Sequence, residues 1–191
     1  CQRFQVQKII AVATAAIRNA PNGEEFTRRI KKQIGFSFQI LSGQKEAYYG
    51  YLGIINTLAE TDYLQFDLGG GSIELVWVKD RKIKKSISLP FGAVTLTEKF
   101  ASQDRISSDG REEMLDWLEK QWKDLEWLKE AKGLPVIGTG GTARNIAKMD
   151  QKRKKYPFYK IHNYPVDDSS IFGIWDDLSK TDLDERKKWP G

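Results

Sequence analysis

The sequence predicts an α/β fold in which strands and helices alternate, with one antiparallel set of strands near the middle. Two observations support this prediction. Apolar residues recur at steps of three and four in some segments and at every second position in others, so both helical and strand periods are present. In addition, six Trp, seven Tyr and nine Phe in 191 residues require a packed core. The length suits one domain, or two small lobes that share a cleft.

The first part of the chain is expected in the order β, α, α, β, α. The elements are a strand at 6–13, a short helix ending at Arg18, a helix at 23–33, a strand at 36–41 and a helix at 45–58. Asn22 and Gly35 flank the second helix as its N-cap and as the glycine that follows its last turn.

Short strands dominate the middle of the chain, and helices follow. The expected elements are strands at 63–68, 73–77 and 83–89, helices at 92–100 and 108–130, a strand at 134–138, and helices at 142–149, 167–179 and after Thr181. Lys79 and Asp80 suit a hairpin turn between the second and third of these strands.

Composition excludes several classes of protein. No run of 18 apolar residues is present, which excludes a membrane span, and the single cysteine, Cys1, excludes an internal disulfide. The net charge is +5, and 151–161 holds five Lys or Arg and no acid. This cluster suits a polyanion or a solvated loop, and no nucleic-acid motif accompanies it. We expect a cytoplasmic protein without a membrane or nucleic-acid partner. Because it begins with Cys1 and stops soon after a charged helix, we also expect a fragment.

A glycine run between two strands is the first candidate site. Asp67 ends one strand, Gly69, Gly70 and Gly71 turn the chain, and Ser72 and Glu74 open the next strand. Successive N–H groups in such a turn can bind an anion, and the two acids could hold a hydrated Mg²⁺ beside a phosphate. The alternative is a simple hairpin, but three glycines exceed what a two-residue turn needs.

A second glycine turn leads from a strand into a helix. It comprises Gly138, Thr139, Gly140, Gly141 and Thr142. Free N–H groups and the helix dipole make such a turn suitable for a phosphate. The alternative is an ordinary connection with Thr142 as the N-cap. Two such loops on different strands favour one polyphosphate lying between them.

Two further residues acquire no role from residue chemistry alone. Glu46 lies in the first turn of an expected helix, where glutamate is favoured for electrostatic reasons. Arg18 follows a strand and suits bidentate phosphate contact, but a lone arginine is more often a surface residue.

These segments occur together, in this order, in a known family, and the chain resembles the Ppx/GppA phosphatases of the actin/Hsp70/sugar-kinase superfamily. The matching residues are Ala13-Thr14 with Arg18, Ser42-Gly43 with Glu46-Ala47, 67–74, Ser88-Leu89-Pro90 with Gly92-Ala93-Val94, and 138–145. The resemblance implies an actin-like, ribonuclease H-like fold with part of a first lobe at 1–60 and most of a second lobe at 61–191. A phosphate chain would lie in the cleft between them.

The resemblance also implies roles for individual residues. Glu46 would be the catalytic base that activates water, and Arg18 would support the phosphate end. Asp67 would hold the metal, with Glu74 beside it, and the two glycine loops would bind phosphate. The expected cofactor is Mg²⁺, and the expected reaction is removal of terminal phosphate from inorganic polyphosphate. A homodimer is also considered.

Alternatives remain open at this point. Guanosine pentaphosphate is an equally anionic substrate, and neither a kinase of the same superfamily nor a sensor that binds without hydrolysis is excluded. The family's first phosphate loop, Asp-x-Gly-Ser-Asn-Ser, has no match here, which puts the activity of this piece alone in question.

Overall fold

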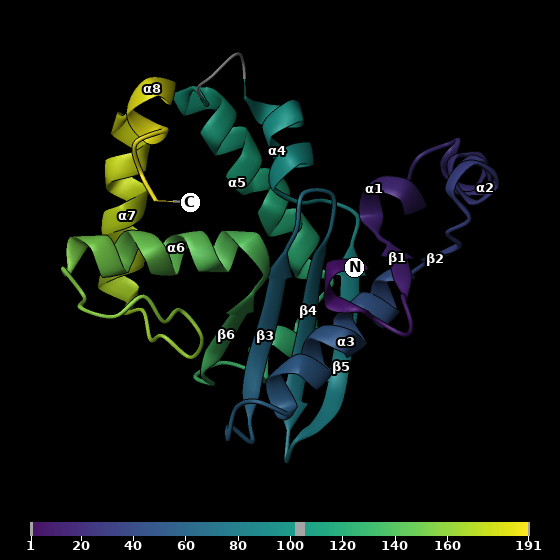
Figure 1. The fold of residues 1–191 in the computed structure, drawn as a ribbon. Coiled ribbons are helices and arrows are strands. Elements are labelled where there is room, and N and C mark those ends of the chain that lie inside the picture. The colour runs from purple at the N-terminus through teal and green to yellow at the C-terminus, as the bar shows by residue number, and fades with distance from the viewer. Residues whose placement is uncertain (1, 102–105, 191) are drawn as a thin grey trace.

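The computed structural model describes residues 2–101 and 106–190, which form two β-sheets with helices around them (Figure 1). Cys1 lies outside this range. The small sheet pairs β1 (Ala11–Ala13) in parallel with β2 (Phe38–Ile40). The large sheet has the strand order β5 (Lys82–Leu89), β4 (Ile73–Lys79), β3 (Tyr63–Leu68), β6 (Val136–Thr139). Its β3–β4 and β4–β5 pairs are antiparallel and its β3–β6 pair is parallel. The predicted mixed α/β fold is confirmed.

The helices follow the expected order with shifted ends. They are α1 (Ala15–Arg18), α2 (Gly23–Ile34), α3 (Gly43–Ile55), α4 (Ala93–Phe100), α5 (Ser108–Lys123), α6 (Gly140–Arg153), α7 (Asp168–Lys180) and α8 (Leu183–Arg186), with 3₁₀ turns η1 (Gln2–Phe4) and η2 (Glu126–Lys129). Over the described ranges, no helix combines the length and apolar character needed to cross a membrane.

Two expected elements are shorter than the sequence suggested. The strand predicted at 6–13 is reduced to β1, because residues 6–10 pair with no described strand and Ile10 is 71% exposed. The helix predicted at 108–130 ends at Lys123, and the chain continues through the 3₁₀ turn η2. The helical spacing of Leu125 and Leu128 persists across this break, and both residues reach the core. Periodicity therefore predicted their burial but not the end of the helix.

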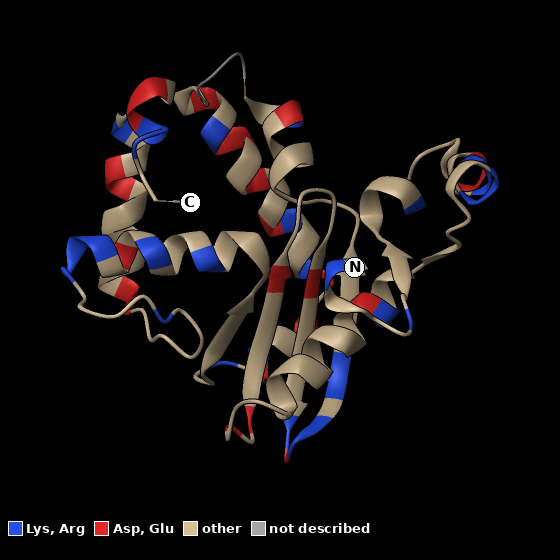
Figure 2. Cartoon of the chain, viewed as in Figure 1, with Lys and Arg blue, Asp and Glu red and all other residues tan. Residues whose placement is uncertain are grey.

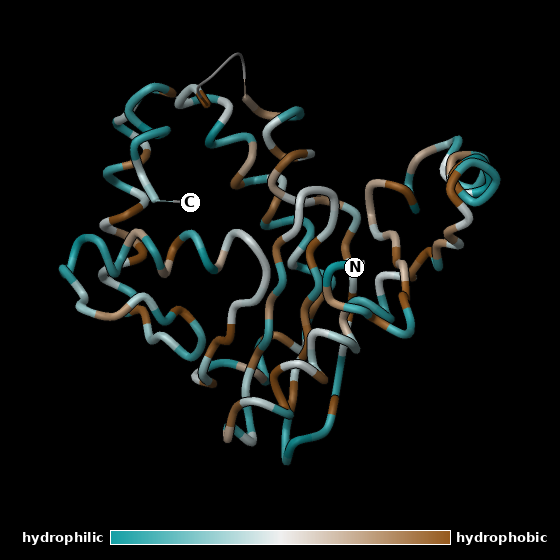
Figure 3. The backbone as a smooth tube through the Cα atoms, in the orientation of Figure 1, coloured by the Kyte–Doolittle hydropathy of each residue, from teal (hydrophilic) through white to brown (hydrophobic). Residues whose placement is uncertain are grey.

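The large sheet is covered on both faces. On one face α3 packs over a cluster that includes Ala47, Tyr63 and Val76 (Figure 1). On the other face, residues of α4, α5 and η2 pack against a cluster that includes Ile73 and Leu75. Successive residues of β4 therefore alternate between two apolar environments, which explains why this strand is almost continuously buried. The hydropathy colouring of Figure 3 is brown along much of β4 and largely teal along α2.

This packing bears on the predicted lobe boundary at residue 60. The helix α3 precedes that boundary in sequence, yet it packs against β4 and β5, which follow it. The division into lobes at 1–60 and 61–191 stays a prediction.

The C-terminal end of α3 and the residues after it are hydrogen-bonded to Arg81 of the β4–β5 turn. The guanidinium of Arg81 donates hydrogen bonds to the carbonyls of Ile55, Leu58, Ala59 and Glu60. The turn itself is formed by Asp80 and Arg81, both with positive φ (50° and 57°), one residue later than expected. Ile55 is the last residue of α3, and a cation at the last carbonyl of a helix stabilises its end. This contact fixes the position of α3, whose first turn carries Glu46.

A buried amide beneath α3 gives a stability prediction. Gln65 is fully buried, neither polar atom of its side chain has a hydrogen-bond partner in the described structure, and a Cβ on Gly50 would lie 2.3 Å from Nε2. We expect Gln65→Met to raise the free energy of unfolding by about 1–2 kcal/mol, because it removes an unpaired buried amide with little change in length. Urea unfolding measures this, with Gln39→Met on exposed β2 as the control. A less stable Gln65→Met variant would contradict the prediction.

Candidate active site

A row of residues in register across the large sheet brings two acidic side chains together. Thr139 lies opposite Asp67, Asp67 opposite Glu74, and Glu74 opposite Ser88, across β6, β3, β4 and β5. Residues opposite each other in neighbouring strands point to the same face of a sheet. The acids Asp67 and Glu74 therefore emerge side by side on the face that α3 covers, directly before and after the first glycine loop.

A cleft of about 450 Å³ opens at this row. Three acids from three different elements line it, namely Glu46 of α3, Asp67 of β3 and Glu74 of β4. The glycine loop at 69–71 forms another part of its wall, and the start of α1 a third. In Figure 2 red segments mark neighbouring parts of β3, β4 and the beginning of α3. The structure thus brings the acids predicted as base and as metal ligands to one cleft with the first glycine loop.

The glycine loop is held by its carbonyl groups. The N–H of Ala93 donates to the Gly69 carbonyl (2.8 Å), and those of Val94 and Thr95 donate to the Gly70 carbonyl (2.9 and 3.2 Å). The first turn of α4 therefore occupies the carbonyls, whereas the N–H groups of Gly70 and Gly71 have no acceptor within the described part of the chain. Free N–H groups on a glycine turn are suited to an anion. This arrangement is what a phosphate-binding loop requires.

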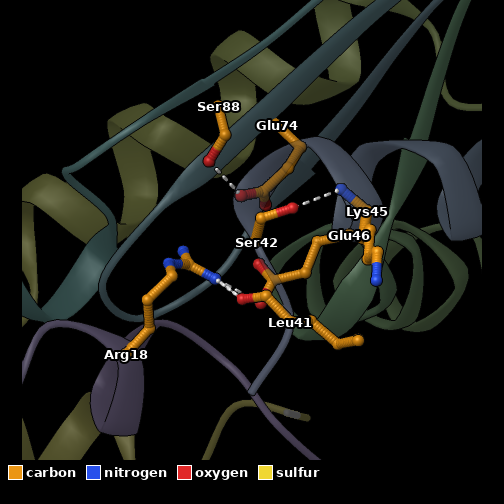
Figure 4. Close-up of polar contacts among 7 residues, drawn as sticks. All are labelled: Arg18, Leu41, Ser42, Lys45, Glu46, Glu74 and Ser88. Carbon is orange, nitrogen blue, oxygen red and sulfur yellow. Dashed lines mark hydrogen bonds and ion pairs between the residues drawn. The ribbon is translucent and has the colours of Figure 1, made fainter. Parts of the chain in front are cut away.

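Glu46 is held by an arginine from a different element. Ser42 caps α3 by accepting a hydrogen bond from the N–H of Lys45 (3.3 Å), which sets the first turn that contains Glu46. Nη1 of Arg18 donates to Oε1 of Glu46 and to the carbonyl of Leu41, both at 2.8 Å (Figure 4). The Glu46 side chain is 14% exposed. A helix-dipole preference alone does not explain a mostly buried, paired glutamate, so the pairing adds weight to the role that the resemblance implied.

Glu74 is the most enclosed of the three acids. It is 4% exposed and accepts a hydrogen bond from Oγ of Ser88 at 2.7 Å (Figure 4). Burial raises the pKa of Glu74, hydrogen bonds from Ser88 and Ser72 act to lower it, and the nearby charges of Glu46 and Asp67 act to raise it. Three acids that repel one another in a cleft form an environment that favours a bound cation. From the sequence, Ser88 has no assigned role and is named only as part of the Ser88-Leu89-Pro90 match to the family.

The second glycine loop lies beside the first but outside the lining of the cleft. It ends β6 and begins α6, which starts at Gly140. A Cβ on Gly140, whose φ is +80°, would lie 2.2 Å from Oδ1 of Asp67. Thr142 lies inside α6, and its hydroxyl donates to the Leu68 carbonyl at 3.0 Å, so the alternative that Thr142 is an N-cap is wrong. Thr139 and Gly140 are the residues of this loop that lie beside Asp67. Phosphate binding by Gly138, Thr139, Gly140, Gly141 and Thr142 stays a prediction.

Lys154, in the basic cluster at 151–161, is bound into the fold. Nζ of Lys154 contacts Asp150 at 3.0 Å and Asp167 at 2.9 Å. Asp150 is 1% exposed, and its pKa is lowered: burial acts to raise it, but hydrogen bonds from Lys154, Ser170 and Tyr164 outweigh that effect. In Figure 2 the blue segments of α6 lie on the side of the molecule away from α1 and α2. Lys154 is therefore a structural residue.

Comparison with known proteins identifies the family. The sequence profile of the Ppx/GppA phosphatase family matches residues 1–189. The chain belongs to this family. A solved structure entitled the Aquifex aeolicus PPX-GPPA enzyme is 31% identical, with a TM-score of 0.75, and the match covers 98% of this chain and 62% of that one. The actin-like fold expected from the resemblance is thereby confirmed.

Two curated relatives show how the family varies. A bifunctional 3-dehydroquinate synthase/phosphatase from Fusobacterium nucleatum is 32% identical over 83% of this chain and 25% of its own length. Exopolyphosphatase 1 from Mycobacterium leprae is 28% identical over 74% of this chain and 43% of its own length. This Ppx/GppA chain thus spans less than half the length of these two relatives.

Proposed function

We propose that this Ppx/GppA chain supplies the catalytic cleft of an exopolyphosphatase, an enzyme that hydrolyses the terminal phosphoanhydride bond of inorganic polyphosphate. The observation that carries the proposal is the convergence of Glu46, Asp67 and Glu74 on one cleft beside a glycine loop. In that loop the N–H groups of Gly70 and Gly71 have no acceptor among the described residues. The relationship to a protein named an exopolyphosphatase supports the choice of substrate.

Each group has a chemical task in this reaction. Gly70 and Gly71 bind the phosphate chain through their N–H groups, and Glu46 takes a proton from a water molecule whose oxygen attacks the terminal phosphorus. The P–O bond to the rest of the chain breaks, which releases inorganic phosphate and a chain shorter by one unit. Arg18, 2.8 Å from Glu46, orients the carboxylate. No histidine or cysteine lines the cleft, so a carboxylate is the base that the described residues offer there.

Mg²⁺ suits the acids of this cleft only as a partly hydrated ion. In the described part of the chain, no group of three or more His, Cys, Asp or Glu could hold a metal by itself. Mg²⁺ is commonly held by one or two carboxylates together with waters and substrate phosphates, and adjacent Asp67 and Glu74 fit that pattern. When bound, the ion neutralises phosphate charge.

A second substrate has one specific observation in its favour. The half-exposed side chain of Tyr49 lines the cleft together with Leu41. An aromatic ring gives a nucleobase a stacking surface that a bare polyphosphate does not use. Guanosine pentaphosphate is therefore the second candidate.

The first test is phosphate release from long-chain polyphosphate and from guanosine pentaphosphate with Mg²⁺. It is made with this chain and with a form extended at both ends, because the chain spans 43% of the M. leprae relative. Release from polyphosphate and water alone supports the proposal and excludes a kinase, which needs an acceptor. Binding of polyphosphate without any release, in both forms, would refute hydrolysis and support the sensor.

The metal assignment gives a prediction of its own. We expect Asp67→Asn to raise the Mg²⁺ concentration needed for half-maximal phosphate release by about tenfold or more, because a neutral amide binds Mg²⁺ less well than a carboxylate. Titrating Mg²⁺ at saturating polyphosphate measures this. Asp62→Asn, which lies directly before β3 and outside the cleft lining, is the control. Unchanged metal dependence in Asp67→Asn would remove Asp67 from the metal site.

A further inference from the structure

Two acids of the cleft are held by donors that lie in a second cavity. This cavity, of about 310 Å³, is lined by Arg18, Ser42, Gly43, Ser86 and Ser88 among others. Arg18 reaches from it to Glu46, and Ser88 reaches from it to Glu74 (Figure 4). The hydrogen bonds Arg18–Glu46 and Ser88–Glu74 thus connect the two cavities. The first of these pairs belongs to the function proposed above, whereas the second has no assigned role.

The position of Ser88 is fixed from two sides. The register of β4 and β5 places it opposite Glu74, and its Oγ donates to Oε1 of Glu74 at 2.7 Å. On the α3 side, Gly43, the first residue of that helix, packs against Ser88. A Cβ on Gly43 would lie 2.1 Å from Oγ and 2.3 Å from Cβ of Ser88. Only glycine leaves room there for the hydroxyl to reach Glu74.

Ser86 provides a comparison within the same strand. It lies two residues before Ser88, hence on the same face of β5, and it lines the same cavity. It is opposite Val76 rather than an acid. A general effect of a serine in this cavity can therefore be separated from an effect of the Glu74 hydrogen bond.

We propose that Ser88 is a positioning residue for Glu74: its hydroxyl, seated in the space left by Gly43, holds the Glu74 carboxylate turned into the cleft toward the bound cation and phosphate. The proposal rests on the proposed function, because the cation and phosphate belong to it. A buried carboxylate on a long side chain adopts one orientation only when a partner selects it, and partners behind a metal-binding group commonly govern affinity. Ser88 supplies such a partner from the neighbouring strand β5, in addition to the hydrogen bond from Ser72.

The test compares four variants in whichever form of the protein the wild type is most active. Ser88→Ala removes the hydroxyl, Ser88→Thr retains it, Gly43→Ala displaces it from the α3 side, and Ser86→Ala is the matched control. Four quantities are measured: kcat and KM for polyphosphate with Mg²⁺, the affinity for Mn²⁺ by electron paramagnetic resonance without substrate, and the thermal midpoint of unfolding.

We expect Ser88→Ala to lower kcat and the Mn²⁺ affinity by about 10–100-fold, with a KM and a thermal midpoint close to those of the wild type. Gly43→Ala should show the same losses, Ser88→Thr should recover most of the rate, and Ser86→Ala should match the wild type. Wild-type kcat and Mn²⁺ affinity in Ser88→Ala would overturn the proposal, as would equal losses in Ser86→Ala.

Failure of the Ser88 proposal can be distinguished from failure of the proposed enzymatic function. If no form hydrolyses polyphosphate or guanosine pentaphosphate, the enzyme proposal fails, yet selective loss of Mn²⁺ affinity in Ser88→Ala and Gly43→Ala still supports the positioning role. If the wild type is active and Ser88→Ala equals it, the enzyme proposal stands and the role of Ser88 is refuted.

Discussion

Replacing Glu46 with Gln is expected to lower phosphate release from polyphosphate by about 10²–10⁴-fold, while the affinity for polyphosphate stays close to that of the wild type. The amide keeps the size of the side chain, and its carbonyl can still accept the hydrogen bond from Arg18 that the carboxylate accepts at 2.8 Å. What it loses is the capacity to take a proton from water. Initial rates and equilibrium binding of polyphosphate measure the two effects separately.

Glu24 provides the control for this experiment. It lies in the first turn of α2, as Glu46 lies in the first turn of α3, and it is exposed. Glu24→Gln therefore tests the loss of a first-turn carboxylate and its dipole interaction without touching the cleft. We expect wild-type rates from it. If Glu46→Gln loses rate and binding together, or loses neither, Glu46 is a structural residue and not the base.

Replacing Gly140 with Ala is expected to have the second largest effect. The added Cβ would lie 2.2 Å from Oδ1 of Asp67, so the carboxylate must leave its position beside the glycine loop. The positive φ of 80° adds about 1–2 kcal/mol of backbone strain. We expect polyphosphate hydrolysis to fall at least as far as in Asp67→Asn, with a raised Mg²⁺ requirement. Rates over a Mg²⁺ titration measure this.

The strain and the contact can be separated with Gly133. Its φ is +84°, close to that of Gly140, but no atom lies within 4 Å of its ideal Cβ. Gly133→Ala should therefore lose about 1 kcal/mol of stability by thermal unfolding and keep its activity. Equal losses of activity in the two variants would show that backbone strain, and not displacement of Asp67, is responsible.

The spacing of apolar residues predicted most of the helices and strands, because that spacing is a property of each segment by itself. The alternation of apolar residues over 63–89 predicted β3, β4 and β5 within a few residues of their ends, and the Gly35 break correctly ended α2. The ends that failed are those that depend on neighbours. The strand expected at 6–13 shortened because no described strand pairs with residues 6–10, and the expected helix at 108–130 broke after Lys123.

The candidate site was predictable in part for the same reason. Asp67, the glycine loop and Glu74 are contiguous in sequence, and their chemistry is visible without a structure. Glu46 and Arg18 are 28 residues apart, so residue chemistry alone left both without a role until the resemblance supplied one. Lys154 belongs to a cluster that suited either a polyanion or a solvated loop, and the structure adds the ion pairs with Asp150 and Asp167 that bind this residue into the fold.

The sequence by itself determined the α/β class, the glycine loop between two acids and membership of the Ppx/GppA family, because each of these is a property of short segments or of their order. Only the tertiary structure decided which groups meet. Strand register set Glu74 opposite Ser88, and the packing of α3 set Glu46 beside Arg18. The first turn of α4 occupies two carbonyls of the glycine loop, while the N–H groups of Gly70 and Gly71 have no acceptor among the described residues. Such contacts depend on how separate elements pack, and no local pattern specifies that packing.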